Sequence, residues 1–252
     1  MAEISTTTIW RWLSEDAIRP WAHRSWVFPC DPDFPEKAGR VLDLYAGTWH
    51  GTPLRKGEFV LCADEKTSIQ ARVRTHETAP PAPGQAMRVE HAYARGGALV
   101  YLAAWDVHRA KLFGRCEPKT GITPFTRLIT QVMRTEPYAS AQRVFLVVDN
   151  GSAHRGQASI TRVAARYPTL VLVHLPRHAS WLNQIEIYFS IVQRKVLTPN
   201  DFMSLAEVTH RLLAFQQRYE RIATPFQWKF TRKHLAKLMA RLADQSALRS
   251  AA

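Results

Sequence analysis

Three acidic residues stand where the surrounding sequence leaves a carboxylate little contact with water. Asp64 and Asp149 each follow a run of five apolar residues, and Glu186 lies inside the largely apolar stretch 180–190. A carboxylate in apolar surroundings is costly unless it is paired or binds a cation. Hard divalent ions prefer oxygen ligands. If the three side chains converge in the fold, they form a site for divalent metal ions.

Each of the three also has an ordinary structural explanation. Asp64 could simply end a strand and bind Lys66 or a backbone amide. Asp149 begins Asp-Asn-Gly, and these residue types are common in turns. Glu186 could lie on the surface, although apolar residues share its helix face. Only the joint arrangement of the three favours a metal site over these alternatives.

The charge of the chain indicates the kind of partner that such a site would act on. Lys and Arg number 34 against 21 Asp and Glu, which leaves a formal net charge of +13 and a pI of about 10.1. An excess of this size favours a phosphate-rich partner such as nucleic acid. A solvated basic surface without a specific ligand is the alternative. The basic residues are spread along the chain, which favours a broad basic face over a disordered arm.

Cysteine usage and hydropathy exclude several classes. The three cysteines, Cys30, Cys62 and Cys116, show no C-x-x-C spacing, so neither a disulfide framework nor a zinc site is indicated. The N-terminus lacks a basic segment followed by an apolar core, and no apolar run reaches the ~20 residues that span a bilayer. We therefore expect a cytoplasmic protein.

The elements that must position the acidic residues follow from hydrophobic periodicity. The sequence predicts a short helix over 5–17 that Ser5 or Thr6 can cap, a proline-containing linker, and a second helix over 35–47. Strands are expected at 58–64, 68–75, 97–105 and 107–114, with an irregular excursion over 76–96. The strand at 107–114 could instead continue the one before it. The remaining pattern predicts helix 122–134, strand 143–149, helix 155–166, strand 170–175, and helices 180–197, 204–222 and 231–243.

This order predicts one mixed sheet covered by helices. The early strands form antiparallel hairpins, and the later crossovers through helices must be parallel and right-handed. Ligands of such sheets bind beyond the C-terminal ends of the strands. Asp64 and Asp149 are both expected at C-terminal strand ends, side by side if their two strands are neighbours.

The segments that carry the acidic residues resemble the DDE motifs of IS630-type transposases, which belong with the Tc1/mariner superfamily. They are Ala63-Asp64-Glu65-Lys66, Val148-Asp149-Asn150 through His154, and Leu182-Asn183-Gln184-Ile185-Glu186. Asp149 and Glu186 are separated by 186 − 149 − 1 = 36 residues, close to the spacing in that superfamily. The resemblance extends over residues 25–243, and it implies an α/β, ribonuclease H-like mixed five-stranded sheet flanked by helices.

The resemblance also implies a chemistry. Asp64, Asp149 and Glu186 would be the catalytic residues and would hold two Mg²⁺ ions, for which Mn²⁺ substitutes, with Asp64 bridging both. Two ions can activate the attacking oxygen and stabilise the leaving oxygen of a phosphodiester. The implied activity is cleavage at transposon ends and transfer of the 3′-hydroxyl into target DNA at TA. The implied partners are inverted repeats, target DNA and a second copy in a homodimer, at the bacterial nucleoid.

Further residues are assigned to supporting roles. Asn183, Asn150 and His154 are expected around the acidic residues, where they would orient a carboxylate or touch substrate. Asp106 and Glu65 are rival acidic residues, and Asp106 is interpreted as structural because it matches no family motif. DNA backbone contacts are expected from a set of polar and basic side chains, although any one of them could be only solvated; the set is Thr7, Thr8, Arg11, Lys66, Arg155, Arg177, His178 and Lys195.

Three domains are predicted. Residues 1–24 resemble the last part of a helix-turn-helix whose helix would read a major groove, with a short packing helix as the alternative. Residues 25–55 form a linker with a short helix, and residues 56–245 form the catalytic domain. Full-length relatives carry a longer N-terminal region, so this chain could be a truncated copy. Two other functions stay open: an inactive DNA-binding relic, and a structure-selective nuclease of the same fold.

Overall fold

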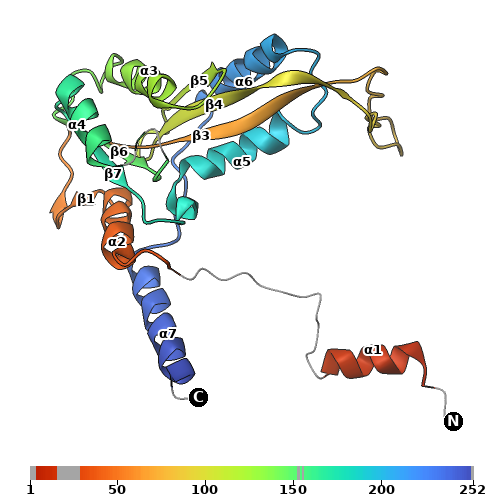
Figure 1. The fold of residues 1–252 in the computed structure, drawn as a ribbon, viewed down its shortest axis with the longest axis horizontal. Coiled ribbons are helices and arrows are strands. Elements are labelled where there is room, and N and C mark those ends of the chain that lie inside the picture. The colour runs from red at the N-terminus through yellow and green to blue at the C-terminus, as the bar shows by residue number, and fades with distance from the viewer. Residues whose placement is uncertain (1–3, 16–28, 152–153, 155, 251–252) are drawn as a thin grey trace.

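One five-stranded sheet organises the molecule, with helices on both of its faces (Figure 1). The computed structural model describes residues 4–15, 29–151, 154 and 156–250. The strand order is β5-β4-β3-β6-β7, and a separate two-stranded ribbon, β1-β2, precedes the sheet in sequence. The strands are β1 (Thr48–Trp49), β2 (Thr52–Pro53), β3 (Glu58–Val73), β4 (Ala94–Asp106), β5 (Leu112–Glu117), β6 (Arg143–Val148) and β7 (Leu170–His174).

The helices lie close to their predicted positions, except that the last helix, predicted over 231–243, continues to Ser250. They are α1 (Thr6–Glu15), α2 (Phe34–Tyr45), α3 (Ile122–Met133), α4 (Gln157–Arg166), α5 (Ile185–Lys195), α6 (Leu205–Glu220) and α7 (Arg232–Ser250), with a single 3₁₀ turn, η1 (Ser180–Leu182), before α5. Ser204 caps α6 by accepting a hydrogen bond from the Glu207 amide at 3.2 Å. None of the helices, over the described residues, combines the length and the hydropathy needed to cross a membrane.

The pairing of the strands confirms the predicted mixed sheet. β3 pairs antiparallel with β4, and β4 pairs antiparallel with β5. On its other edge β3 pairs parallel with β6, and β6 with β7, through the crossover helices α3 and α4. β3 is therefore the central strand, at the boundary between the antiparallel and parallel halves.

The prediction of two strands at 58–64 and 68–75 is wrong, because β3 runs without a break from Glu58 to Val73. β4 pairs with β3 both before and after residues 67–68, from Leu61 to Lys66 and again from Ile69 onward. The register shift between Lys66 and Ile69 is a β-bulge, with Ser68 at φ 57°. A bulge inserts one residue and bends the strand without ending it.

The alternative that residues 107–114 continue the preceding strand is also excluded. A turn separates β4 from β5, in which Ala110 has φ 57° and donates its amide hydrogen bond to the Asp106 carbonyl at 3.0 Å. β5 then begins at Leu112, five residues later than predicted.

Alternation along β3 divides the core between the two faces of the sheet. Val60 and Cys62 pack in the core under α5 and α6, to which α2 and α7 also contribute, whereas Leu61 and Ala63 pack on the face of α3 and α4. α2 lies in the segment predicted as a linker, yet its apolar side, Phe34, Ala38, Val41, Leu42 and Leu44, is buried in the first of these cores.

The N-terminal helix has a different character. The Thr8 amide donates to the Ser5 hydroxyl at 3.2 Å, so Ser5 caps the helix as predicted. α1 has no buried residue, and Ile9, Trp10 and Trp12 are exposed. Residues 16–28, which include the end of the predicted helix and much of the predicted linker, lie outside the described part of the chain.

Candidate active site

Asp64 lies inside β3, at the point where the parallel half of the sheet ends. The prediction that it closes a strand is wrong, because β3 continues for nine residues beyond it. The parallel ladder to β6 stops at Cys62 and Val147. Side chains alternate along a strand, so Asp64 projects on the same face as Cys62, toward α5. Asp64 nevertheless lies just beyond the last residue of β3 that pairs with β6, so this edge of β3 is open beside it, as it would be at a strand end.

Asp149 follows β6 immediately and comes level with Asp64. Continuing the register that pairs Cys62 with Val147 places position 149 beside position 64. Asp149 also has the parity of Phe145 and Val147, which face the core under α5. The sequence predicted that the two aspartates lie side by side only if their strands are neighbours. β3 and β6 are neighbours, and their pairing brings the two aspartates to one face.

Glu186 reaches this face from the start of α5. The predicted helix over 180–197 is wrong in its first turn: residues 180–182 form η1, and α5 begins at Ile185. Asn183 separates the two with an extended backbone, ψ 114°. Glu186 therefore lies in the first turn of α5, where the positive end of the helix dipole stabilises a carboxylate.

The three carboxylates interact electrostatically. Burial, together with the nearby charges of Asp149, Glu65 and Glu186, raises the pKa of Asp64 to about 7. Burial likewise raises the pKa of Glu186, while Lys66 lowers it and Asp149 raises it. Like charges that share a site disfavour ionisation. A bound cation would therefore stabilise the ionised forms of these carboxylates.

A hard divalent cation fits the donor chemistry of this cluster, since its donors are carboxylate oxygens that repel one another. Among the described residues no three His, Cys, Asp or Glu side chains already stand at metal-binding distances. Asp64 and Glu186 would have to draw closer to Asp149 around an ion.

Asp149 differs from its two partners because it is already held by hydrogen bonds. His154 contacts the Oδ1 atom of Asp149 through Nε2, and the Gly151 amide donates to the same oxygen at 2.7 Å. The His154 hydrogen bond is the main cause that lowers the pKa of Asp149. The His154 ring is buried, so it orients Asp149 and is not placed to meet a phosphate.

The two asparagines take separate places. Asn183 is buried; its Nδ2 donates to the Ala63 carbonyl at 3.1 Å and lies 3.4 Å from Oδ2 of Asp64. Asn150 instead donates to the Leu175 carbonyl at 2.8 Å, which ties the loop after β6 to the end of β7. Asn183 therefore touches the acidic cluster, and Asn150 shapes the loop beside it.

A hollow of about 410 Å³ opens beside Asp149. The loop 149–151 forms one wall, and the loop 176–180, with the exposed side chains of Arg177 and His178, forms the other.

The buried Asp31, which pairs with Lys37 at 3.1 Å, accepts a hydrogen bond from the Arg177 amide at 2.8 Å and so positions this second wall. Sequence reasoning missed Asp31, because its partner lies 146 residues away.

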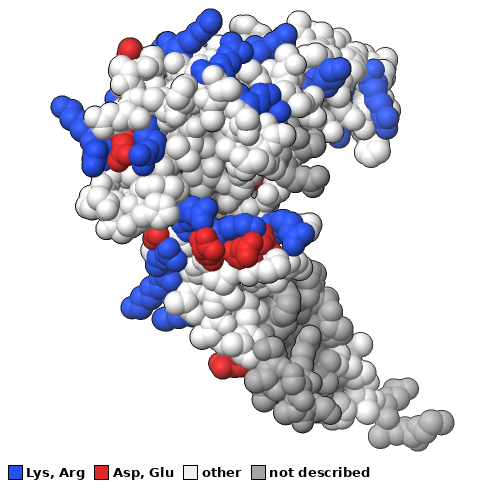
Figure 2. Space-filling model, turned by 60° about the vertical axis from the view of Figure 1, so that its left-hand side comes forward, with Lys and Arg blue, Asp and Glu red and all other residues white. Residues whose placement is uncertain are grey.

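The structure separates the other predicted DNA contacts. Lys66 lies near Glu186, as its effect on that carboxyl shows, whereas Lys195 is exposed in the last turn of α5, about 13 Å along the helix from Glu186. Thr7, Thr8 and Arg11 lie on α1, and Arg155 lies outside the described residues. On the face shown in Figure 2, Lys and Arg side chains are spread widely and Asp and Glu are fewer.

The rival acidic residues have other surroundings. Asp106 accepts hydrogen bonds from the Tyr138 hydroxyl at 2.7 Å and from the amides of His108 and Arg109 at 3.0 and 2.9 Å. These bonds occupy its carboxylate and explain its structural role at the end of β4. Glu65 alternates to the opposite side of β3 from Asp64, and burial raises its pKa.

Comparisons with known proteins agree with this geometry. Residues 59–209, more than half of the chain, match the family model described as DDE superfamily endonuclease. No curated protein matches the sequence. A solved Mos1 mariner paired end complex with Mn superposes with a TM-score of 0.56 at 14% identity, covering 94% of this chain and 69% of that one. The Mos1 mariner catalytic domain gives 0.50 at 14% identity, with 86% of this chain and 97% of that one covered. These likenesses confirm the ribonuclease H-like fold class.

Proposed function

Because the chain belongs to the DDE superfamily of endonucleases, we propose that it is a DNA transposase of the IS630 type. It cleaves DNA at the ends of its element and joins the resulting 3′-hydroxyl to target DNA at TA. The observation that carries the proposal is the placement of Asp64, Asp149 and Glu186 on one face of the sheet, with mutual effects on their ionisation.

The roles of the three residues follow from their surroundings. Asp64, Asp149 and Glu186 would hold two Mg²⁺ ions through their carboxylate oxygens, and Mn²⁺ would substitute. When bound, such ions activate the attacking oxygen and stabilise the leaving oxygen of a phosphodiester. His154 and the Gly151 amide keep Asp149 ionised and oriented, and Asn183 holds Asp64 against the start of α5.

The substrate proposal rests on charge and on the hollow beside Asp149. A chain of net charge +13 attracts a polyanion. Arg177 and His178 line the hollow opposite Asp149 and would contact the phosphates of the cleaved strand. Solved Mos1 structures are titled as a paired end complex and a strand transfer complex. By analogy we propose that this chain acts as a homodimer on two transposon ends, in the bacterial cytoplasm at the nucleoid.

We also propose that α1 belongs to a DNA-reading segment. Its exposed Thr7 and Arg11 and its half-buried Thr8 would face a major groove or its phosphates. Removal of residues 1–24 should then reduce the preference for transposon ends over unrelated DNA, while joining of precut 3′-ends to target DNA by residues 25–245 should remain.

One experiment separates the proposed function from its alternatives. The chain is incubated with Mn²⁺ and two DNAs: a plasmid with the element ends that flank its gene, and duplexes with precut 3′-ends plus a supercoiled target. Cleavage at the ends and joined product would support a transposase. Cleavage without any joined product would favour a structure-selective nuclease. DNA binding without either reaction would favour an inactive relic. The Glu186→Gln variant controls for contaminating nucleases.

A further inference from the structure

The antiparallel part of the sheet extends well past its parallel part. β6 pairs with β3 only as far as Cys62, whereas β3 and β4 continue together to Val73 and Ala94. This long ribbon projects away from β6 and β7 (Figure 1). Beyond Cys62 the second edge of β3 thus has no strand partner in the part of the chain that the structure describes. Such an edge exposes backbone groups that need another partner.

The segment after α5 takes the place of the missing strand. The Arg72 amide donates to Oδ1 of Asn200 at 3.2 Å, and Nδ2 of Asn200 donates to the Gln70 carbonyl at 2.8 Å. One side chain thus satisfies two backbone groups of β3. The loop that follows α5 is thereby held alongside the ribbon, and a groove remains between them.

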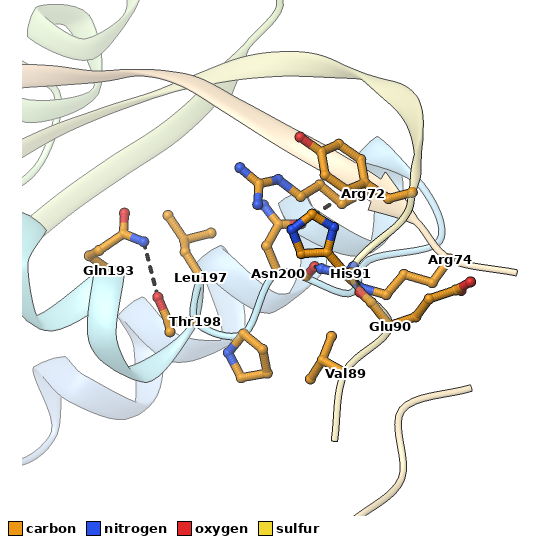
Figure 3. A pocket seen from close by; sticks show the side chains of 11 residues that line it. Arg72, Arg74, Val89, Glu90, His91, Gln193, Leu197, Thr198 and Asn200 are labelled. Carbon is orange, nitrogen blue, oxygen red and sulfur yellow. Dashed lines mark hydrogen bonds between the residues drawn. The ribbon is translucent and has the colours of Figure 1, made fainter. Parts of the chain in front are cut away.

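The groove has two adjoining hollows. One of about 600 Å³ lies at the far end, among Arg72, Arg74, Tyr93 and Asn200 (Figure 3), and one of about 220 Å³ lies nearer the acidic cluster and includes Lys66. They share four lining residues: Arg72, Gln193, Leu197 and Asn200. We call the two together the ribbon groove. It runs along β3 from the neighbourhood of Glu186 outward.

Uncompensated positive charge gathers at the far end of the ribbon groove. Arg72 lines both hollows, and Arg95, which lines neither, stands directly opposite it in the register of β3 with β4; like charges in that position destabilise a sheet. Within the described residues neither of them, nor Arg74, has a carboxylate within 4.0 Å. An anionic ligand would relieve this repulsion.

The nearby acidic residue does not neutralise these arginines. Glu90 turns its carboxylate to the amides of Thr75 and His76, at 3.0 and 2.9 Å, and to the His76 ring. Arg74 donates to the carbonyls of Glu90 and Asn200, the latter at 2.8 Å, and so fixes the wall of the groove.

Arg72 is held ready for a ligand. Its guanidinium lies 4.7 Å from the centre of the Tyr93 ring, a cation–π contact that orients the charge. Nε of Arg72 is buried and has no hydrogen-bond partner among the described residues. The Arg74 guanidinium also lies 5.6 Å from the centre of the Tyr93 ring, so the ring supports both arginines. Arginine forks of this kind match phosphate oxygens.

We infer that the ribbon groove binds the phosphate backbone of DNA on one side of the cleavage point, an inference that rests on the proposed function. Lys66 lines the inner hollow and also interacts with Glu186, which links the groove to the acidic cluster. From Lys66 to Arg72 the strand rises about 20 Å. At 3.4 Å per nucleotide this reaches about six nucleotides from the scissile phosphate. The contact adds affinity without reading sequence.

The test is a binding measurement without metal, so that no cleavage occurs. Fluorescence anisotropy gives the affinity for labelled duplexes of one end sequence that extend 3 or 15 base pairs on either side of the mapped cleavage point. Arg72→Ala and Arg95→Ala should each weaken binding about tenfold on one long extension. Each should also lower the slope of log K against log salt by about 1. Neither substitution should change the affinity for the duplex that has only 3 base pairs on the side where the long extension is affected.

Arg134→Ala provides the matched control, since Arg134 is exposed at the end of α3, away from the ribbon groove, and has no salt bridge in the described part of the chain. Unchanged thermal unfolding of each variant excludes misfolding, and Arg72→Lys should retain most of the salt slope. Wild-type behaviour of both Arg72→Ala and Arg95→Ala would overturn the inference, as would equal losses on short and long duplexes. If the wild-type chain binds no DNA at all, the proposed function fails instead.

Discussion

The side-chain amide of Asn183 lies 3.4 Å from the Asp64 carboxylate while it donates to the neighbouring Ala63 carbonyl at 3.1 Å. These contacts join the centre of β3 to the residue that lies two positions before α5, across 119 positions of sequence. Glu186 follows three residues later, and its amide donates to the Asn183 carbonyl at 3.1 Å. Asn183 thus sets the position of Glu186 relative to Asp64.

Replacing Asn183 should therefore impair catalysis more than folding. Asn183→Ala removes the bond to Ala63 and the orientation of Asp64, and we expect cleavage and metal affinity to fall about 10- to 100-fold. Stability should fall by only about 1–2 kcal/mol. The measurements are single-turnover cleavage and urea unfolding. Val208→Ala, a buried change in α6, provides a variant of reduced stability with an intact site. An Asn183→Ala enzyme as active as Val208→Ala would contradict the positioning role.

Asp64→Asn should stabilise the metal-free protein. The folded-state pKa of Asp64, about 7, exceeds the ordinary value of 3.8, so the native state binds more protons than the unfolded state between these values. Wild-type stability must then fall as the pH rises from about 4 to about 7. The variant should lack this fall and gain roughly 2 kcal/mol at pH 8, because each pKa unit corresponds to about 1.4 kcal/mol and solvent screens part of the effect. Urea unfolding from pH 5 to 8 measures it.

Asp149→Asn should have the opposite effect on stability. The hydrogen bond from His154 lowers the pKa of Asp149, so its carboxylate stabilises the fold above the unfolded pKa, and this contribution is lost as the pH falls through the folded pKa. Loss of the charge should therefore destabilise the variant at pH 7 and hardly matter near pH 3. Urea titrations over the same pH range measure the free energy of unfolding of both variants. If Asp64→Asn and Asp149→Asn changed it equally, the opposite pKa shifts of Asp64 and Asp149 would be refuted.

Glu186→Gln should abolish cleavage and leave DNA binding intact. The amide is nearly isosteric but cannot supply an anionic ligand, so we expect the cleavage rate to fall at least about 100-fold. DNA affinity should stay within twofold. Glu136→Gln, at an exposed position beyond α3, is the matched control and should cleave normally. Full activity of Glu186→Gln would remove Glu186 from the catalytic site.

Divalent ions should stabilise the wild-type chain. At 100 times its dissociation constant a ligand of the native state adds about 2.7 kcal/mol to the free energy of unfolding. We expect a shift of this order in Mn²⁺ and Mg²⁺ titrations followed by thermal unfolding, with none in Asp64→Asn. The absence of any shift at millimolar Mn²⁺ would favour an inactive relic.

The sequence by itself determined most of the elements and the identity of the acidic residues. Hydrophobic periodicity is a local property, so helix 122–134 and strand 143–149 appear in the structure as α3 and β6 with ends within one residue of those predicted. The apolar runs before Asp64 and Asp149 also marked buried strands correctly. A carboxylate beside such a run is visible from sequence alone, because burial follows from the neighbouring residues.

Tertiary structure alone decided the features that depend on distant partners. The continuity of β3 through its polar residues depends on pairing with β4, and the late start of α5 accompanies the contact of Asn183 with β3. The ribbon groove requires Asn200 to meet β3 about 130 residues away. The pKa of Asp64 likewise depends on carboxylates brought by β6 and α5. Local sequence encodes propensity and burial, but only the folded chain sets the spacing of charges that are remote along it.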